Sequence, residues 1–217
     1  MNDLKIYGTA RSRTVRVLWM AHELGLAFEH IPTKIARQPN PTARNYFAEG
    51  ETHTPEFLAL NPNGRIPVID DGGAVVWESM AINLYLARKH GGGLWPDSVA
   101  GEGHAFQWSF WAMTEAEGPL FRYLLHKTFL PEAERDQDAA SEAEATLGDR
   151  IAILERALEE CDYLLGNAFS VADLNLASVL AWLGLGPFDL SGHPAVKAWL
   201  ERCLARPAYG KAVAMGR

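Results

Sequence analysis

The residues of this chain best suited to binding chemistry lie in two neighbouring segments of its first half. The first spans residues 61–70 and reads Asn-Pro-Asn-Gly-Arg-Ile-Pro-Val-Ile-Asp; the second spans residues 76–79 and reads Val-Trp-Glu-Ser. Turn residues followed by an apolar β-branched pair predict a loop that leads into a short strand. The second segment ends a strand, and Ser79 is predicted to cap the helix that follows.

The start of that helix is suited to an α-amino acid. A helix N-terminus presents unpaired N–H groups and the positive end of a dipole, which together bind a carboxylate. Glu78 beside it supplies the negative charge that an ammonium group needs. After Ile66-Pro67 the strand offers backbone hydrogen bonds to an extended peptide, and a cis bond there exposes the amide and carbonyl of Ile66. Singly these residues are a cap, a surface charge and a turn; together they indicate a site for a small anionic peptide.

In this order and spacing, the two segments resemble the glutathione-binding half of the soluble (cytosolic) glutathione transferase superfamily. In that family the proline is cis, the residue before it pairs with the cysteinyl backbone of glutathione, and the Glu-Ser pair holds the γ-glutamyl end. The resemblance assigns these roles to Pro67, Ile66, Glu78 and Ser79, and it extends over nearly the whole chain.

A transferase of this kind must raise the thiolate fraction of glutathione, because a free thiol is mostly protonated at neutral pH. A hydroxyl donor or a positive helix end within hydrogen-bond reach lowers the pKa of that thiol. Ser12 follows the first predicted strand and opens the first predicted helix, where both are available. Ser12 lies four residues before Arg16, which resembles the serine-type branch of the superfamily and makes Ser12 the catalytic candidate.

Other readings of this segment stay open. Ser12 is also suited to be an ordinary helix cap. The tyrosine-type pattern Tyr-x-x-x-Arg-x-Arg begins at Tyr7, although Arg16 falls too early for that branch, and Thr9 is a third, weaker donor. No cysteine occupies the region, so thiol exchange of the glutaredoxin kind is disfavoured.

Two basic side chains are candidates for holding the glycyl carboxylate of glutathione. Relatives often read Gly-Glu-His-Lys where this chain has Gly-Glu-Thr-His at residues 50–53, so His53 stands where lysine is common. A binding role for His53 is therefore weakened, and a solvated loop histidine is an equal alternative. Arg65 is the second candidate, with an ordinary surface charge as its alternative.

The second substrate is expected to be apolar and electrophilic, and to lie where the helical domain faces Ser12. Trp108, Trp111 and Glu115 share one predicted helix face at i, i+3 and i+7. Aromatic residues at this spacing also serve as core, so the pocket and the core both remain readings of this face.

The hydrophobic pattern predicts an α/β thioredoxin-like N-terminal domain over residues 1–90, a linker over 91–97 and an all-α C-terminal helical domain over 98–217. The predicted elements of the first domain are strand 4–7, helix 12–24, strand 27–31, a long irregular loop over 32–54, helix 55–60, hairpin strands 67–70 and 75–77, and helix 80–89. In the second domain Pro119 is expected to kink or split a helix. Ser170 and Asp173 are expected to form a capping box.

Composition excludes several classes of protein. A net charge of −7 over 217 residues argues against nucleic-acid binding, and no apolar run approaches the ~20 residues that cross a bilayer. The N-terminus lacks the apolar stretch of a signal peptide, so a cytoplasmic location is expected. The seven histidines and two cysteines show no metal-ligand spacing, so no metal is expected. Cys161 and Cys203 are both expected in buried helical positions.

The resemblance implies a cytoplasmic homodimer that acts in detoxification by conjugating the glutathione thiolate to a small apolar electrophile. Glutathione is then a co-substrate, with neither nucleic acid nor membrane as a partner. Two alternatives use the same fold. One is a glutathione-dependent isomerase or peroxidase, and the other is a non-catalytic protein that binds glutathione or another ligand.

Overall fold

The computed structural model describes residues 3–34, 36–37, 47–48 and 51–216. Contacts divide the chain into two compact units, one made of Met1–Gly92 with Pro207–Arg217 and the other of Gly93–Arg206. The first break lies close to the predicted linker. The second differs from the predicted division, which gave all of 98–217 to the helical domain, because the last helix packs against the first unit.

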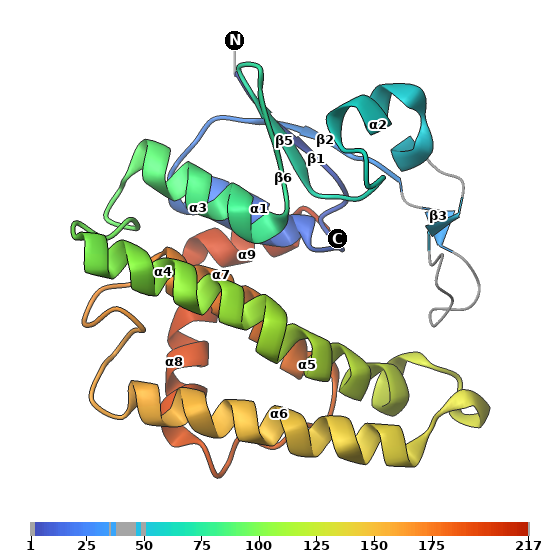
Figure 1. Ribbon diagram of the computed structural model, residues 1–217, viewed down its shortest axis with the longest axis vertical. Coiled ribbons are helices and arrows are strands. Elements are labelled where there is room, and N and C mark those ends of the chain that lie inside the picture. The colour runs from blue at the N-terminus through green and yellow to red at the C-terminus, as the bar shows by residue number, and fades with distance from the viewer. Residues whose placement is uncertain (1–2, 35, 38–46, 49–50, 217) are drawn as a thin grey trace. The chain divides into compact units, whose positions relative to one another are not determined.

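The first unit is built on a four-stranded sheet with the order β2-β1-β5-β6 (Figure 1). Its strands are β1 (Leu4–Tyr7), β2 (Glu29–Ile31), β5 (Val68–Asp71) and β6 (Ala74–Trp77). β1 pairs parallel with β2 and antiparallel with β5, and β5 pairs antiparallel with β6 through a hairpin. This is the strand order that the predicted thioredoxin-like domain requires.

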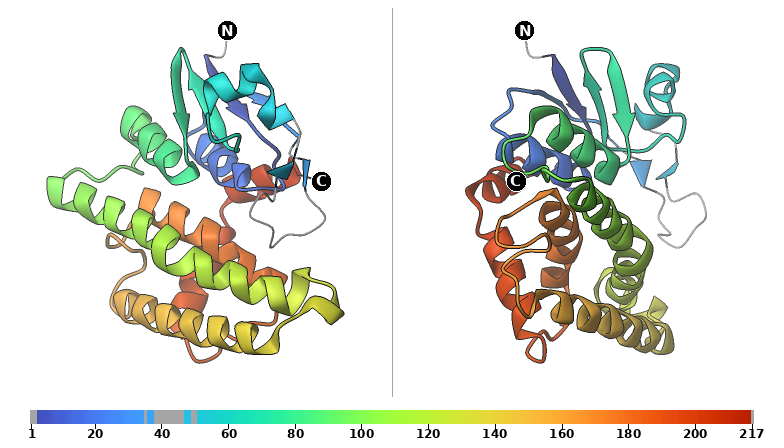
Figure 2. Two further views of the ribbon diagram at one scale, coloured as in Figure 1. Left: turned by 45° about the vertical axis from the view of Figure 1, so that its right-hand side comes forward. Right: turned by 60° about the vertical axis from the view of Figure 1, so that its left-hand side comes forward.

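Two helices cover one face of this sheet, α1 (Thr14–Glu23) and α3 (Ser79–His90) (Figure 2). Both bury apolar side chains toward the strands, among them Leu18 and Ile82. The last helix, α9 (Pro207–Ala214), packs along α1, and the Tyr209 ring lies 4.8 Å from that of the fully buried Trp19. This ring contact, with the packing of α9 along α1, explains why α9 belongs to the first unit.

Between β2 and β5 the chain forms short elements where the sequence predicts a long loop and one helix. They are β3 (Ala36–Arg37), β4 (Phe47–Ala48), the 3₁₀ turn η1 (Glu51–His53) and α2 (Pro55–Leu60). β3 and β4 pair antiparallel, so the expectation of an irregular loop is wrong for these residues. The rest of that prediction, over 35, 38–46 and 49–50, lies outside the described residues. The predicted helix 55–60 is confirmed.

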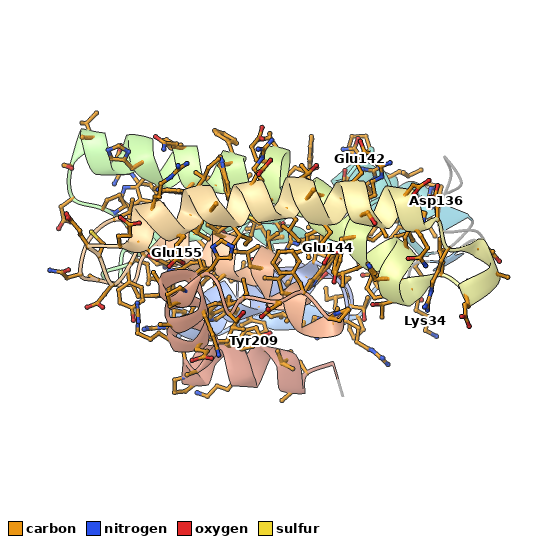
Figure 3. All side chains as sticks on the ribbon, turned by 90° about the horizontal axis from the view of Figure 1, so that it is seen from below. Lys34, Asp136, Glu142, Glu144, Glu155 and Tyr209 are labelled. Atoms are coloured by element: carbon orange, nitrogen blue, oxygen red, sulfur yellow. The ribbon has the colours of Figure 1, made fainter. Side chains whose placement is uncertain are left out.

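The second unit is helical, as predicted. Its helices are α4 (Val99–Trp111), α5 (Glu117–Leu124), α6 (Gln137–Leu158), α7 (Val171–Leu180) and α8 (Pro194–Leu204). Every residue of α7 is buried, so this helix forms the centre of the unit. Figure 3 shows Glu155 on α6 beside the start of α8, where its carboxylate accepts the N–H groups of Ala195 and Val196 at 2.9 and 2.8 Å. These bonds satisfy donors that a helix start leaves unpaired.

The predicted break near Pro119 takes the form of a π-helical turn. The turn η2 (Ala112–Ala116) joins α4 to α5, and the Glu117 N–H donates to the Ala112 carbonyl. Pro119 has no N–H for the carbonyl of Glu115, four residues earlier, and its ring crowds that carbonyl. Wider π-type bonding just before the proline accommodates this defect.

The capping box at the start of α7 is confirmed. The Ser170 N–H and hydroxyl both donate to Asp173 Oδ2, at 2.9 and 2.7 Å. Asp173 Oδ1 also accepts from the Leu164 N–H and the Trp199 indole N–H, at 2.8 and 2.9 Å. Burial raises the pKa of Asp173, although these hydrogen bonds act in the opposite direction.

The cysteines follow the expectation only in part. Cys203 is buried in α8, whereas Cys161 is exposed, because α6 ends at Leu158 before reaching it.

Among the helices of the described residues, none combines the length and the apolar character that crossing a membrane requires.

Candidate active site

The turn before β5 presents the backbone of Ile66. The Ile66–Pro67 bond is cis, as the resemblance implies. The Asn61 side chain is buried and holds the preceding turn, because its amide donates to the Arg65 carbonyl at 2.7 Å and its oxygen accepts the Asn63 N–H at 3.0 Å. The backbone at Ile66 is therefore fixed before any ligand arrives.

The side chain of Ile66 points into a small apolar cluster with Phe57 and Val68. Tyr7 packs against the same cluster, and its ring meets that of Phe57 edge-on at a centroid distance of 6.4 Å. These contacts give Tyr7 a packing role. They leave the backbone of Ile66, rather than its side chain, as the group able to bind a ligand.

The start of α3 carries the most unusual backbone of the site. Glu78 is exposed and has φ 72° and ψ 116°, and it is the one non-glycine with positive φ among the described residues. Such a conformation costs of order 1–3 kcal/mol and is concentrated at functional sites. Glu78 stands at the cap position, so the prediction that Ser79 caps the helix is wrong. Ser79 is the first helical residue instead.

The hydroxyl of Ser79 faces the interior because it accepts a hydrogen bond from the buried Arg16 guanidinium, at 3.4 Å. Arg16 lies in α1, and its carbonyl accepts from the Asn83 side-chain amide of α3, also at 3.4 Å. These bonds tie the beginning of α1 to the beginning of α3. The structure therefore brings the helix start after Ser12 and the Glu78–Ser79 pair into one region of the first unit.

Ser12 lies in the loop between β1 and α1. The helix begins at Thr14, so the predicted start at Ser12 is two residues early. The half-buried hydroxyl of Ser12 donates to the Thr9 carbonyl at 2.7 Å and accepts the Thr14 N–H at 3.1 Å. It thus satisfies a helix-start donor, and it lies where the positive end of the α1 dipole acts.

The two basic candidates flank the turn that leads to the cis proline. His53 is exposed in η1, and its Nδ1 lies 3.2 Å from the Thr52 hydroxyl. Its other ring nitrogen lies against Gly64, where an added Cβ would stand 3.1 Å from it. Arg65 is exposed on the same turn. Contact of either side chain with a ligand stays a prediction.

The candidates for the second-substrate pocket belong to the helical unit. Trp108 and Trp111 are half-buried, with rings 5.4 Å apart and edge-to-face, so they do share a helix face. Glu115 lies in the π-helical turn, and its carboxylate pairs with Arg150 of α6 at 2.9 Å. The pocket stays a prediction.

Across the described residues, no three His, Cys, Asp or Glu side chains gather where they could hold a metal ion.

Sequence reasoning missed how the loop before Ser12 is held. The Gly8 N–H donates to the Ile31 carbonyl at 3.0 Å, and its own carbonyl lies 2.8 Å from His30 Nε2. Gly8 has φ 138°, and a Cβ there would collide with the Thr14 hydroxyl. A glycine directly after a strand is a visible signal, but nothing local in the sequence connects it to His30.

Comparison with known proteins matches both parts of the chain. Residues 12–89 match the glutathione S-transferase N-terminal domain, and residues 113–207 match its C-terminal domain. "Glutathione S-transferase 3" of Zea mays is 34% identical to this chain, and the aligned region covers 99% of this chain and 95% of the maize protein. The chain belongs to the glutathione S-transferase family. GstB of Escherichia coli (strain K12), another family member, is 30% identical, with 97% of each chain covered.

Solved structures of the family have the same fold. The theta class glutathione S-transferase of Xanthomonas axonopodis pv. citri, with glutathione bound, has a TM-score of 0.85 and 32% identity over 98% of both chains. Glutathione S-transferase-I bound with lactoylglutathione has a TM-score of 0.82 and 28% identity, covering 98% of this chain and 99% of its own. The resemblance drawn from the sequence is confirmed, and with it the fold and the enzyme class, a transferase with glutathione as co-substrate.

Proposed function

We propose that this transferase is of the serine type and that Ser12 activates the glutathione thiol for attack on a small apolar electrophile. The position of the Ser12 hydroxyl, half-buried at the start of α1, is the observation that carries the proposal. A hydroxyl there stabilises a thiolate by donating its proton to it, and the α1 dipole adds to that effect. Tyr7 is the weaker candidate because its ring packs on Phe57.

The same proposal assigns the binding of the tripeptide. The backbone of Ile66, turned outward by cis Pro67, pairs with the cysteinyl residue of glutathione. Glu78 holds the γ-glutamyl ammonium group, and the first N–H groups of α3, beginning with Ser79, hold its carboxylate. His53 and Arg65 flank the turn and supply positive charge for the glycyl carboxylate.

Replacing Ser12 by alanine tests the catalytic assignment. We expect Ser12→Ala to lower kcat with a standard electrophile by about 10²–10³-fold, the range for losing one positioned donor, with little change in glutathione binding. Tyr7→Phe is the matched control, since it removes a hydroxyl from the rival residue and keeps the ring. If Tyr7→Phe, rather than Ser12→Ala, abolishes turnover, the serine assignment is wrong.

Turnover on a panel of substrates separates the possible reactions. Electrophiles, hydroperoxides and cis-enone acids distinguish a conjugating transferase from an isomerase or a peroxidase on the same site. We expect conjugation to dominate, with Trp108 and Trp111 lining the pocket for the apolar partner. Glutathione binding without acceleration of any of these reactions would instead mark a non-catalytic binding protein.

We further propose that the enzyme is a cytoplasmic homodimer with a role in detoxification. Glutathione and thioredoxin keep thiols reduced in the cytosol, where the co-substrate is available in its reactive form. Support for self-association comes from an apolar stripe on α4, formed by Val99, Phe106 and Phe110, whose exposed fractions are 86%, 40% and 62%. Exposed apolar stripes of this kind mark interaction surfaces.

A further inference from the structure

The proposed catalytic hydroxyl of Ser12 is in contact with a second hydroxyl, that of Thr14. Thr14 is fully buried at the first position of α1. Its hydroxyl lies 3.0 Å from Ser12 Oγ, and its N–H donates to the same oxygen at 3.1 Å. Two groups of one buried residue therefore bond to the atom that is proposed to face sulfur.

The hydrogen-bonding capacity of Ser12 limits what these contacts can be. A serine hydroxyl has one proton to donate and two lone pairs to accept with. The Thr14 N–H occupies one lone pair, and the Thr9 carbonyl takes the proton at 2.7 Å. With that proton committed, the 3.0 Å contact is satisfied only when the Thr14 hydroxyl donates to the second lone pair.

Gly8 packs closely against the Thr14 side chain. A Cβ on Gly8 would collide with the Thr14 hydroxyl, so this glycine leaves the space that the hydroxyl occupies. Gly8 is itself fixed, because Ile31 accepts its N–H and His30 bonds to its carbonyl. The Thr14 hydroxyl therefore occupies a space that a fixed backbone leaves open, and from there it lies 3.0 Å from Ser12 Oγ.

We propose that Thr14 is a positioning residue, whose hydroxyl donates to Ser12 Oγ and holds that oxygen in place while the Ser12 proton turns from the Thr9 carbonyl to the sulfur of glutathione. This inference rests on the proposed function of Ser12. When the Ser12 O–H turns toward sulfur, the lone pairs of Oγ turn with it, and the Thr14 hydroxyl keeps donating because its own O–H bond can rotate to follow. A chain of hydroxyls also polarises each member, so the Ser12 O–H becomes a stronger donor to the thiolate.

The test is the pKa of glutathione bound to the enzyme, read from the ultraviolet absorbance of the thiolate as pH is varied. We expect Thr14→Val, which keeps the shape and removes the hydroxyl, to raise this pKa by about 0.5–1 unit, the size of one hydrogen bond. We expect kcat/KM near neutral pH to fall by about three- to tenfold for the same reason. Thr14→Ser keeps the hydroxyl and should restore both values.

Thr33→Val is the matched control, because Thr33 is also buried and its hydroxyl donates to the Ile31 carbonyl, at 3.1 Å, and not to Ser12. It should leave the bound thiol unchanged. In a Ser12→Ala background, Thr14→Val should have no further effect on the thiol, since the two hydroxyls act as one unit. Thr14→Ala supplies the same comparison if the valine variant does not fold.

The outcomes separate this inference from the proposal on which it rests. If the wild-type enzyme itself does not lower the pKa of bound glutathione, the proposed role of Ser12 fails. If the wild type does so and Thr14→Val matches it, only the role of Thr14 fails. Equal shifts in Thr14→Val and Thr14→Ser would mean that packing, and not the hydroxyl, matters, which also overturns the inference.

Discussion

At the scale of single residues, Glu78 combines a strained backbone with an exposed carboxylate. Its positive φ gives no gain in stability, because a glycine would adopt the same conformation without strain. A strained non-glycine residue persists where its side chain is needed. This makes Glu78 the residue at which stability and binding are expected to oppose each other.

Two substitutions of Glu78 test that opposition. Glu78→Gln should raise the Kd for glutathione about tenfold, because the neutral amide no longer pairs with the ammonium charge, and should leave stability unchanged. Glu78→Gly should weaken binding at least as much but raise the free energy of unfolding by about 1 kcal/mol through relief of strain. Calorimetric titration and urea unfolding measure the two quantities.

Glu29→Gln is the control for charge, because Glu29 is exposed on β2 of the same unit and has no proposed contact with glutathione. An unchanged Kd in Glu78→Gln would remove Glu78 from the site. A loss of stability in Glu78→Gly would show that the backbone there is not strained.

At the scale of elements, α1 carries a histidine in a setting that disfavours its charge. His22 packs edge-on against Phe28, at 5.3 Å between ring centroids, and its Nε2 is buried without a hydrogen-bond partner. Burial lowers the pKa of His22, and the positive charge of Lys211 on α9 lowers it further. The unfolded chain, with the ordinary histidine pKa, therefore binds a proton that the folded chain releases.

The pH dependence of stability follows from this sign. Because the pKa of His22 is lower in the folded state, the free energy of unfolding should fall as pH drops below about 6.5 toward the folded pKa. His22→Leu should flatten this part of the profile. Urea unfolding at about pH 7.5 and about pH 5.5 compares the two proteins. Equal losses of stability in both would exclude His22 as the source.

Local signals made some elements predictable and left others hidden. The capping box at Ser170 and Asp173 was readable because its partners lie three residues apart. The further bond from Trp199 to Asp173 spans 26 residues and has no local signature. The prediction that Ser79 caps α3 failed because its partner is also distant in the sequence. The Ser79 hydroxyl accepts a hydrogen bond from Arg16 on another helix and does not cap its own.

The candidate site was predictable where a motif fixes the backbone, as at Ile66–Pro67. It was not predictable where distant residues meet, as His30 meets Gly8 across the β1–β2 pair.

At the scale of the whole molecule, too, features set by the order of elements were predictable and features set by distant contacts were not. Strand order follows from the sequence of elements, whereas the packing of α9 on α1 depends on a contact between Trp19 and Tyr209 that no local pattern encodes.

Self-association is also a property of the whole molecule. The apolar stripe on α4 should be covered in the proposed homodimer, so Phe106→Ser combined with Phe110→Ser should yield a monomer. Phe129→Ser removes an equally apolar ring, 46% exposed, elsewhere in the helical unit, and should leave the dimer intact. Sedimentation velocity gives the mass of each form. A doubly substituted protein that remains dimeric would place the interface elsewhere.

The most direct test of the account is a crystal structure of the enzyme with glutathione bound. We predict that the sulfur lies within about 3.5 Å of Ser12 Oγ, with the cysteinyl backbone paired to Ile66 and the γ-glutamyl group between Glu78 and the start of α3. A sulfur atom bonded to Tyr7 or Thr9, with Ser12 still donating to the Thr9 carbonyl, would contradict it.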